Sequence, residues 1–167
     1  NPSFLVFSRD NKLLGDHAIT RGRDAAERVT RVVTFTGQSL KGPAGSAAFL
    51  KLSDTAMDRQ PPAKDSKTVT LDRLPNSQQL PPGVTIQGQI PGPSVSAAGR
   101  AQGIALTYGK GRVVVLGEAA MLSAQVVKGI AAQLAGKDEI QMGMNRAGLD
   151  NRQLALNIMH WLTRLLN

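Results

Sequence analysis

One acidic side chain follows an apolar run in the second half of the chain. Glu118 lies in the stretch "VVVLGEAAML", residues 113–122, directly after a glycine. An ionised carboxylate is costly to bury without a partner, so we expect Glu118 just past the end of a buried strand. There it could serve as a general base, a general acid or an anchor for a ligand. The alternative is structural, because "EAAML" could open a helical turn whose free N–H groups favour an acidic side chain.

A loop histidine offers proton transfer. His17 lies in "GDHAIT", and we take Glu118 and His17 as the candidate catalytic residues. Asp16 precedes His17 directly, but neighbouring side chains do not face each other, so adjacency alone does not make them a dyad. The alternative role of His17 is a hydrogen bond that holds the loop, or simple exposure, since loops lie mostly at the surface.

Polar side chains follow a predicted strand and lie in a later loop. The candidate ligand-binding residues are Thr36, Gln38 and Ser39 in "TFTGQSL" and Asn145 in "QMGMNRAGLD". Hydroxyl and amide groups of this kind hydrogen-bond sugars or amides. The alternative is a turn in which Gly37 gives backbone freedom and the hydroxyls cap a helix, with Asn145 in a similar capping role.

Composition excludes several classes of site. The chain has no cysteine, which removes disulfides, thiolate metal sites and a cysteine nucleophile from its 167 residues. Its 2 histidines lie far apart and no acidic cluster has ligand spacing, so we expect no metal and no cofactor. The net charge is +8, but the basic residues are dispersed and aromatic residues make up only 4%, so we expect no nucleic-acid partner. No apolar stretch approaches the length of a membrane span.

Strands are predicted from runs of apolar and β-branched residues. The segment 104–116 predicts a β-hairpin with "GKG" as its turn, the first strand alternating and the second, 113–116, buried on both faces. Further strands are predicted at 31–37 and, more weakly, at 47–52.

Helices are predicted from three-to-four spacing of apolar residues. The clearest is "DNRQLALNIMHWLTRLLN", with Asp150 and Gln153 forming a capping-box-like start. A second helix is predicted at 122–137, with Gly129 weakening it, and a short polar helix around 23–27.

An insertion rich in proline, glycine, serine and glutamine interrupts this pattern at about 54–99. Long stretches of this kind inside a compact domain tend to be functional or mobile. A short strand at 68–71 is expected to pair within the insertion. Outside it, strands that alternate with helices predict a single α/β domain over 1–167, with helices on both faces of the sheet and ligands bound beyond the strand ends.

Several segments together resemble a known family. These are "LLGDHAITRGR", "RVVTFTGQSL", "YGKGRVVVLGEAAMLSAQ", "GMN" and "DNRQLALNIMHWL". They are similar to the C-terminal half of an uncharacterised bacterial family in the class I glutamine-amidotransferase-like superfamily, whose relatives include trehalose-utilisation-like proteins. The resemblance implies a flavodoxin-like doubly wound sheet, partly antiparallel at its C-terminal hairpin, whose first strands lie upstream of Asn1. Ala18 departs from the family, which more often has proline there.

The resemblance does not extend to glutaminase chemistry. The chain has no cysteine, no G-x-S-x-G elbow and no histidine two residues from a glutamate. The leading hypothesis is a non-glutaminase domain that binds a small polar ligand, such as a carbohydrate, at the strand-end crevice. The alternatives are a hydrolase that uses Glu118 with residues from upstream, and a structural or protein-interaction module with the insertion as its contact surface. A periplasmic or secreted location is favoured over the cytoplasm.

Overall fold

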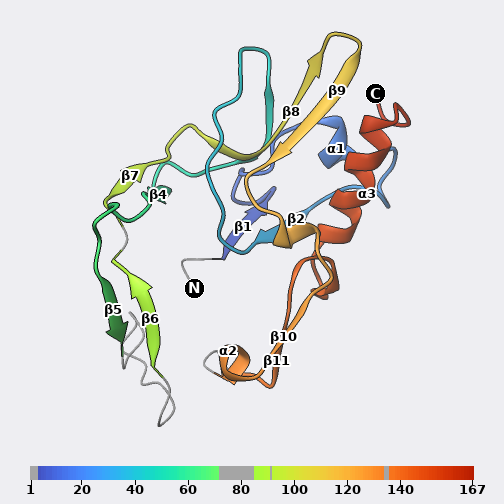
Figure 1. Ribbon diagram of the computed structural model, residues 1–167. Coiled ribbons are helices and arrows are strands. Elements are labelled where there is room, and N and C mark those ends of the chain that lie inside the picture. Colours follow the sequence, from blue (N-terminus) through green and yellow to red (C-terminus); the bar gives the residue numbers. More distant parts are fainter. Residues whose placement is uncertain (1–3, 72–84, 91, 134–135) are drawn as a thin grey trace.

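The chain folds into small antiparallel sheets, with one longer helix packed on one side of the body (Figure 1). The structure, a computed structural model, describes residues 4–71, 85–90, 92–133 and 136–167 (Figure 1). The body contains two of these sheets, in which strands pair in the orders β1-β2 and β3-β8-β9. Their bounds are β1 Leu5–Ser8, β2 Arg31–Thr34, β3 Ala47–Lys51, β8 Ala101–Tyr108 and β9 Gly111–Leu116.

Helix α3 (Asn151–Leu162) covers the body on one side, and the single-turn helix α1 (Ala18–Arg21) packs against it. The apolar stripe of α3 places Leu154, Ile158 and Trp161 in the core, each less than a tenth exposed. Phe7, Val32, Phe49 and Leu50 from the sheets and Ile19 from α1 join them, each fully buried. The sheets and the helix therefore share one core.

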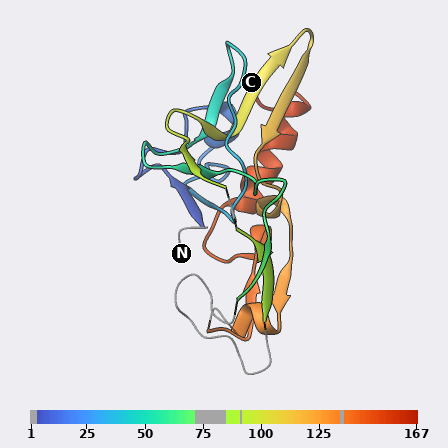
Figure 2. The same ribbon diagram turned by 60° about the vertical axis from the view of Figure 1, so that its left-hand side comes forward.

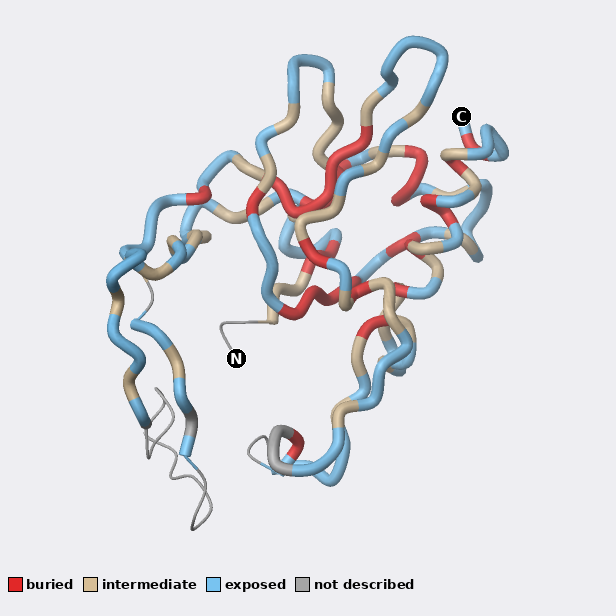
Figure 3. Tube along the Cα trace, in the orientation of Figure 1, coloured by how far each residue is buried: buried red, intermediate tan, exposed pale blue. Residues whose placement is uncertain are grey.

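Two ribbon-like arms extend from the same side of the body, as both views show (Figures 1 and 2). The long arm, residues 53–96, carries the pairs β4-β7 and β5-β6, with bounds Met57–Arg59, Ser94–Ser96, Thr68–Leu71 and Ile86–Gln89. The short arm, residues 123–142, pairs β10 (Val126–Lys128) with β11 (Glu139–Gln141) and carries α2 (Ile130–Gln133). None of the described long-arm residues is buried, and Ala132 in α2 is the one buried residue among those described on the short arm (Figure 3).

Buried amides attach α3 to the body. Asn157 is fully buried and donates from Nδ2 to the carbonyl oxygens of Ile19 and Glu27, at 2.9 and 2.8 Å.

Asp150 accepts from the N–H and hydroxyl of Thr30 at 2.6 and 2.7 Å, and from the N–H of Arg31 at 3.0 Å. Its side chain makes no capping bond to α3, so the predicted capping box is wrong. The carboxylate instead ties the helix start to β2.

The predicted α/β flavodoxin-like doubly wound fold is wrong. The sheets that the structure describes are small and antiparallel, and α3 is the only helix of more than one turn among the described residues. A doubly wound fold needs parallel strands joined by crossover helices, and one long helix cannot cover both faces of a sheet. None of the described helices has the length and apolar character that crossing a membrane requires.

The 104–116 hairpin is confirmed, with Gly109 and Lys110 between the paired residues Tyr108 and Gly111. The expected burial of its strands is reversed. The first strand, β8, has two neighbours and is buried over its first five residues. The second, β9, lies at the edge of the sheet and alternates, with Val113 and Val115 each 38% exposed. The Val-rich run is therefore an edge strand with one face toward the core.

Two predicted helices are absent from the described residues, whereas the shorter strands are confirmed. Among the described residues of 122–137, 126–128 form β10 and 130–133 form the single turn α2, and residues 23–27 form bends and a turn. The strand predicted at 31–37 is present but ends at residue 34, the one predicted at 47–52 covers 47–51, and the strand at 68–71 pairs with β6 inside the insertion as expected.

Candidate functional site

The backbone segments that follow β2 and β9 cross in close contact at Gln38 and Gly117. The N–H of Gln38 donates to the carbonyl of Gly117 at 2.9 Å, and the N–H of Gly117 donates to the carbonyl of Gln102, also at 2.9 Å. A Cβ on Gly117 would lie 2.0 Å from the Gln38 oxygen, and one on Gly37 would lie 2.6 Å from the Gly117 oxygen. Glycine is therefore required on both sides of this crossing.

The buried side chain of Gln102 holds the loop that follows β2 in place. Its side chain, 3% exposed, accepts from the hydroxyl of Thr34 at 2.7 Å and donates to the carbonyl of Thr36 at 2.8 Å. A buried amide satisfied on both atoms holds its partners in one geometry. The backbone from residue 34 to residue 38 is thus held by bonds from two separate strands.

Thr36 adopts a backbone conformation that its side chain disfavours. Its φ is +106°, where a β-branched residue meets steric strain, and the next residue, Gly37, has φ +116°. Thr36 and Gln38 are exposed, so the strained backbone lies at the surface. Strain of this kind persists only where surrounding contacts over-determine it, and it clusters at ligand sites.

Glu118 lies beneath this loop and caps the 3-10 turn η1 (Ala120–Leu122). Its side chain is 8% exposed, and its two oxygens accept from the backbone N–H groups of Ala120 and Met121, the latter at 2.9 Å. These contacts agree with the structural alternative, in which Glu118 opens a helical turn and binds its free N–H groups.

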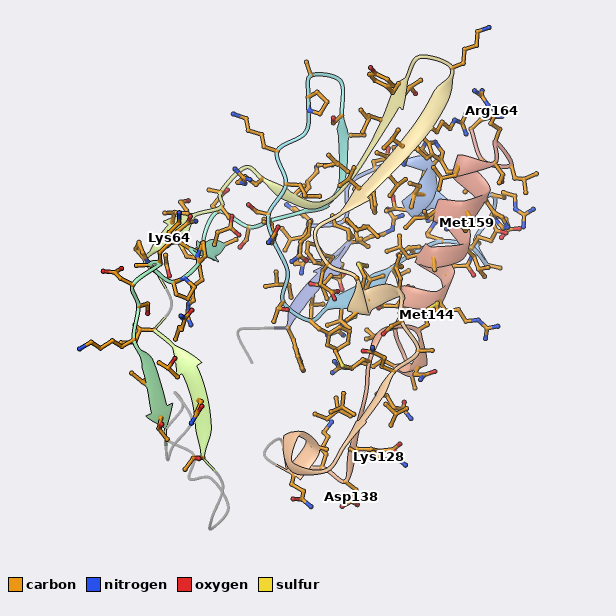
Figure 4. All side chains as sticks on the ribbon, in the orientation of Figure 1. Lys64, Lys128, Asp138, Met144, Met159 and Arg164 are labelled. Carbon is orange, nitrogen blue, oxygen red and sulfur yellow. The ribbon has the colours of Figure 1, made fainter. Side chains whose placement is uncertain are left out.

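A second 3-10 turn, η2 (Gly143–Asn145), packs against η1. Gly143 is required here, since a Cβ on it would lie 2.3 Å from the Ala120 oxygen. The exposed side chain of Asn145 donates to the Ala124 carbonyl, so it acts within the turn. Figure 4 shows Met144 at this point, where the short arm leaves the body. We call residues 35–39, 117–122 and 143–146 the strand-end junction.

Ser39 lies on the long-arm side of the junction. It is 9% exposed and its hydroxyl donates to Asp58, at the base of the long arm. Its carbonyl accepts from the guanidinium of Arg100 at 3.1 Å. Ser39 therefore joins the arm to the body, whereas Thr36 and Gln38 present their side chains to solvent.

His17 lies at the opposite end of α3 from Glu118. Asn151, the first residue of α3, contacts the Met121 carbonyl at 3.1 Å, whereas the His17 ring lies 5.1 Å from the ring of Trp161. Ten helical residues separate these two contacts by about 15 Å. The two candidate catalytic residues are therefore not brought together.

The contacts of His17 describe a structural role. Its Nδ1 accepts from the N–H of Ile19 at 3.2 Å and caps α1. Burial against aromatic rings lowers the pKa of His17, because the charged imidazolium loses hydration, and the nearby cations Arg21 and Arg112 act in the same direction. The neutral ring that results suits a capping acceptor.

Sequence reasoning missed two residues of this region. Gln102 has no motif and is identified only by its buried partners, although a lone glutamine in an apolar strand pattern was a signal. Arg146, which follows η2, lies over the rings of Phe4 and Phe35 at 5.6 and 5.9 Å. Its sequence context, "MNRAG", gave no indication of this packing.

Within the described ranges, no group of three or more histidine, aspartate or glutamate side chains is placed to hold a metal ion. Comparison of the chain with protein-family models, with curated proteins and with solved structures finds no match in any of the three. The function must therefore be argued from the strand-end junction itself.

Proposed function

We propose that the strand-end junction binds a small polar ligand and that the chain acts as a binding domain without glutaminase chemistry. The observation that carries the proposal is the strained backbone of Thr36, held at the surface by Gln102 and Gly117. A strained loop fixed from two strands is pre-organised, and pre-organisation reduces the entropy lost on binding. The proposal does not depend on the family resemblance, which stays a prediction.

The exposed groups of the loop suit a ligand rich in hydroxyl or amide groups. Thr36 contributes a hydroxyl and Gln38 an amide, and neither side chain hydrogen-bonds another described residue. These side chains offer both donors and acceptors, which is what a carbohydrate requires. Asn145 borders the same junction with a second exposed amide, although one of its N–H groups is used by Ala124.

The hydrolase alternative receives less support. Both oxygens of Glu118 are engaged by backbone N–H groups, and His17 lies at the far end of α3. A general base must lie within reach of the proton that it abstracts, and Glu118 is only 8% exposed. Binding is therefore favoured over hydrolysis by these described residues.

A protein-interaction role is a second candidate, because the long arm lacks a core. Met57, Ile90 and Val95 on this arm are 57%, 61% and 43% exposed. Two-stranded ribbons are marginally stable alone, so a partner on this arm would supply the missing packing. This role and ligand binding at the junction do not exclude each other.

The proposal is tested by thermal shift with a panel of neutral mono- and disaccharides and amino-acid amides. We expect at least one to raise the melting temperature saturably, by several degrees at high saturation. Gln38→Ala should remove this shift and leave the melting temperature without ligand unchanged, because Gln38 is exposed. Gln133→Ala on the short arm is the matched control and should keep the shift. No saturable shift, or an equal shift in Gln38→Ala, would count against the proposal.

A further inference from the structure

Arg146 packs its guanidinium against two adjoining aromatic rings at the edge of the junction. It lies over Phe4 and Phe35, whose own rings meet edge-on at 5.1 Å. Phe35 directly precedes the strained Thr36, so the arginine lies beside the proposed ligand loop. The residue as a whole is partly exposed, whereas the NH1 atom of its guanidinium is buried.

This guanidinium has no polar partner among the described residues. Its NH1 atom is buried without a hydrogen bond, and no carboxylate pairs with it. Other arginines packed on the body differ. Arg9 donates to the carbonyls of Val29 and Thr20, and Arg112 donates to those of Trp161 and Leu166. An unpaired charge with a buried donor is unfavourable, since cation–π contacts replace only part of its lost hydration.

We infer that Arg146 binds an oxyanion, either a carboxylate or a phosphate, carried by the small polar ligand of the junction. This inference rests on the proposed function and adds the charge class of the ligand. Carboxylate and phosphate oxygens match the planar fork of a guanidinium, and neighbouring aromatic rings exclude water and strengthen the interaction. The chain's net charge of +8 also favours an anion over a cation.

The oxyanion and the rest of the ligand have separate contacts. Arg146 adjoins Phe35, whereas Thr36 and Gln38 are the next exposed side chains along the same loop. A ligand with an anionic group at one end and hydroxyl groups beyond it would engage both. Its anionic group would give the guanidinium the acceptor that the described protein groups do not provide.

Thermal shift with inorganic phosphate and with acetate, at constant ionic strength set by sodium chloride, tests the inference. We expect one of these anions to raise the melting temperature saturably, and which one does so distinguishes phosphate from carboxylate recognition. Arg146→Gln should abolish the shift, and Arg146→Lys should weaken binding at least tenfold, since lysine lacks the fork. The matched control is Arg152→Gln, at an exposed position of α3, and it should respond as the wild type does.

A stability readout keeps the test decisive if Arg146→Gln folds poorly. Arg146→Met replaces an unpaired cation by an apolar side chain, so without anion it should melt at or above the wild-type temperature while losing the anion response. Equal anion shifts in the wild type and Arg146→Met, or no saturable shift with either anion, would overturn the inference. A neutral saccharide shift that needs Gln38, together with no saturable anion shift in the wild type, would overturn the inference and leave the proposed function standing. Loss of both responses would overturn both.

Discussion

The side chain of Asn151 pairs with both backbone groups of Val33, as a neighbouring strand would. Its Oδ1 accepts from the Val33 N–H at 3.0 Å and its Nδ2 donates to the Val33 carbonyl at 2.8 Å. The same Nδ2 donates to the Met121 carbonyl at 3.1 Å, so one buried amide joins α3, β2 and η1. These elements position the strand-end junction.

Asn151→Leu should lower the free energy of unfolding by about 3 kcal/mol. The substitution leaves a buried N–H and two buried carbonyls without their partner, and unsatisfied buried groups cost more than the bonds they made. Urea denaturation measures the change. Arg152→Leu, the exposed neighbouring position, is the control and should stay within about 0.5 kcal/mol. A similar loss in both variants would contradict the role of Asn151.

Thr36→Gly should stabilise the protein in the absence of ligand, by about 1 kcal/mol. Glycine adopts a φ of +106° without the steric cost that threonine meets. Thr55→Gly, in a loop where φ is not positive, is the matched control and should be neutral or destabilising, because glycine gains entropy on unfolding. Denaturation curves of the two variants distinguish strain relief from a general effect of glycine, and a destabilised Thr36→Gly would refute the strain.

Glu118→Gln should lower the free energy of unfolding by about 1–2 kcal/mol without any ligand present. Glutamine keeps one acceptor oxygen but turns an NH2 group toward the second backbone N–H of η1, where two donors then face each other. Glu139→Gln on the exposed short arm is the control. Unchanged stability in Glu118→Gln would show that the carboxylate is free for chemistry, contrary to its contacts.

The lowered pKa of His17 predicts a loss of stability in mild acid. Because the folded state binds a proton less readily than the unfolded chain, the free energy of unfolding is highest above the ordinary histidine value of 6.5 and falls as the pH drops below it. His17→Asn keeps an acceptor that can cap α1 but cannot titrate. Urea midpoints between pH 7.5 and about 5 should therefore fall less in the variant. Parallel pH dependences in the two proteins would contradict this.

Local patterns were sufficient for β2, β3, β5, β8 and β9 and for α3, whereas the other described strands were not located from the sequence. They failed for 122–137, where apolar residues recur every four positions. An even spacing also fits one face of a strand, and Val126 and Val127 favour β structure. Gly129 adopts φ +74° and ends β10, which no continuous helix would allow.

The error in fold class arose from neighbours that a single sequence does not show. An apolar run such as 113–116 looks the same in a central strand and in an edge strand whose outer face is partly exposed. The order in which the strands pair, β3-β8-β9, makes β8 the central strand and β9 an edge strand. Likewise, the residue type of Glu118 indicated a carboxylate at a strand end, but only the backbone of η1 shows what its oxygens accept.

The two arms set the size of the unit that unfolds cooperatively. Their backbone hydrogen bonds lie outside the core of the body, since the described long-arm residues are all at least partly exposed and Ala132 is the one buried residue described on the short arm (Figure 3). Amide protons of β5, β6, β10 and β11 should therefore exchange with solvent through local opening, well before those of β2, β8 and α3. Because the denaturant m-value scales with the surface exposed in the cooperative step, it should correspond to a domain smaller than 167 residues.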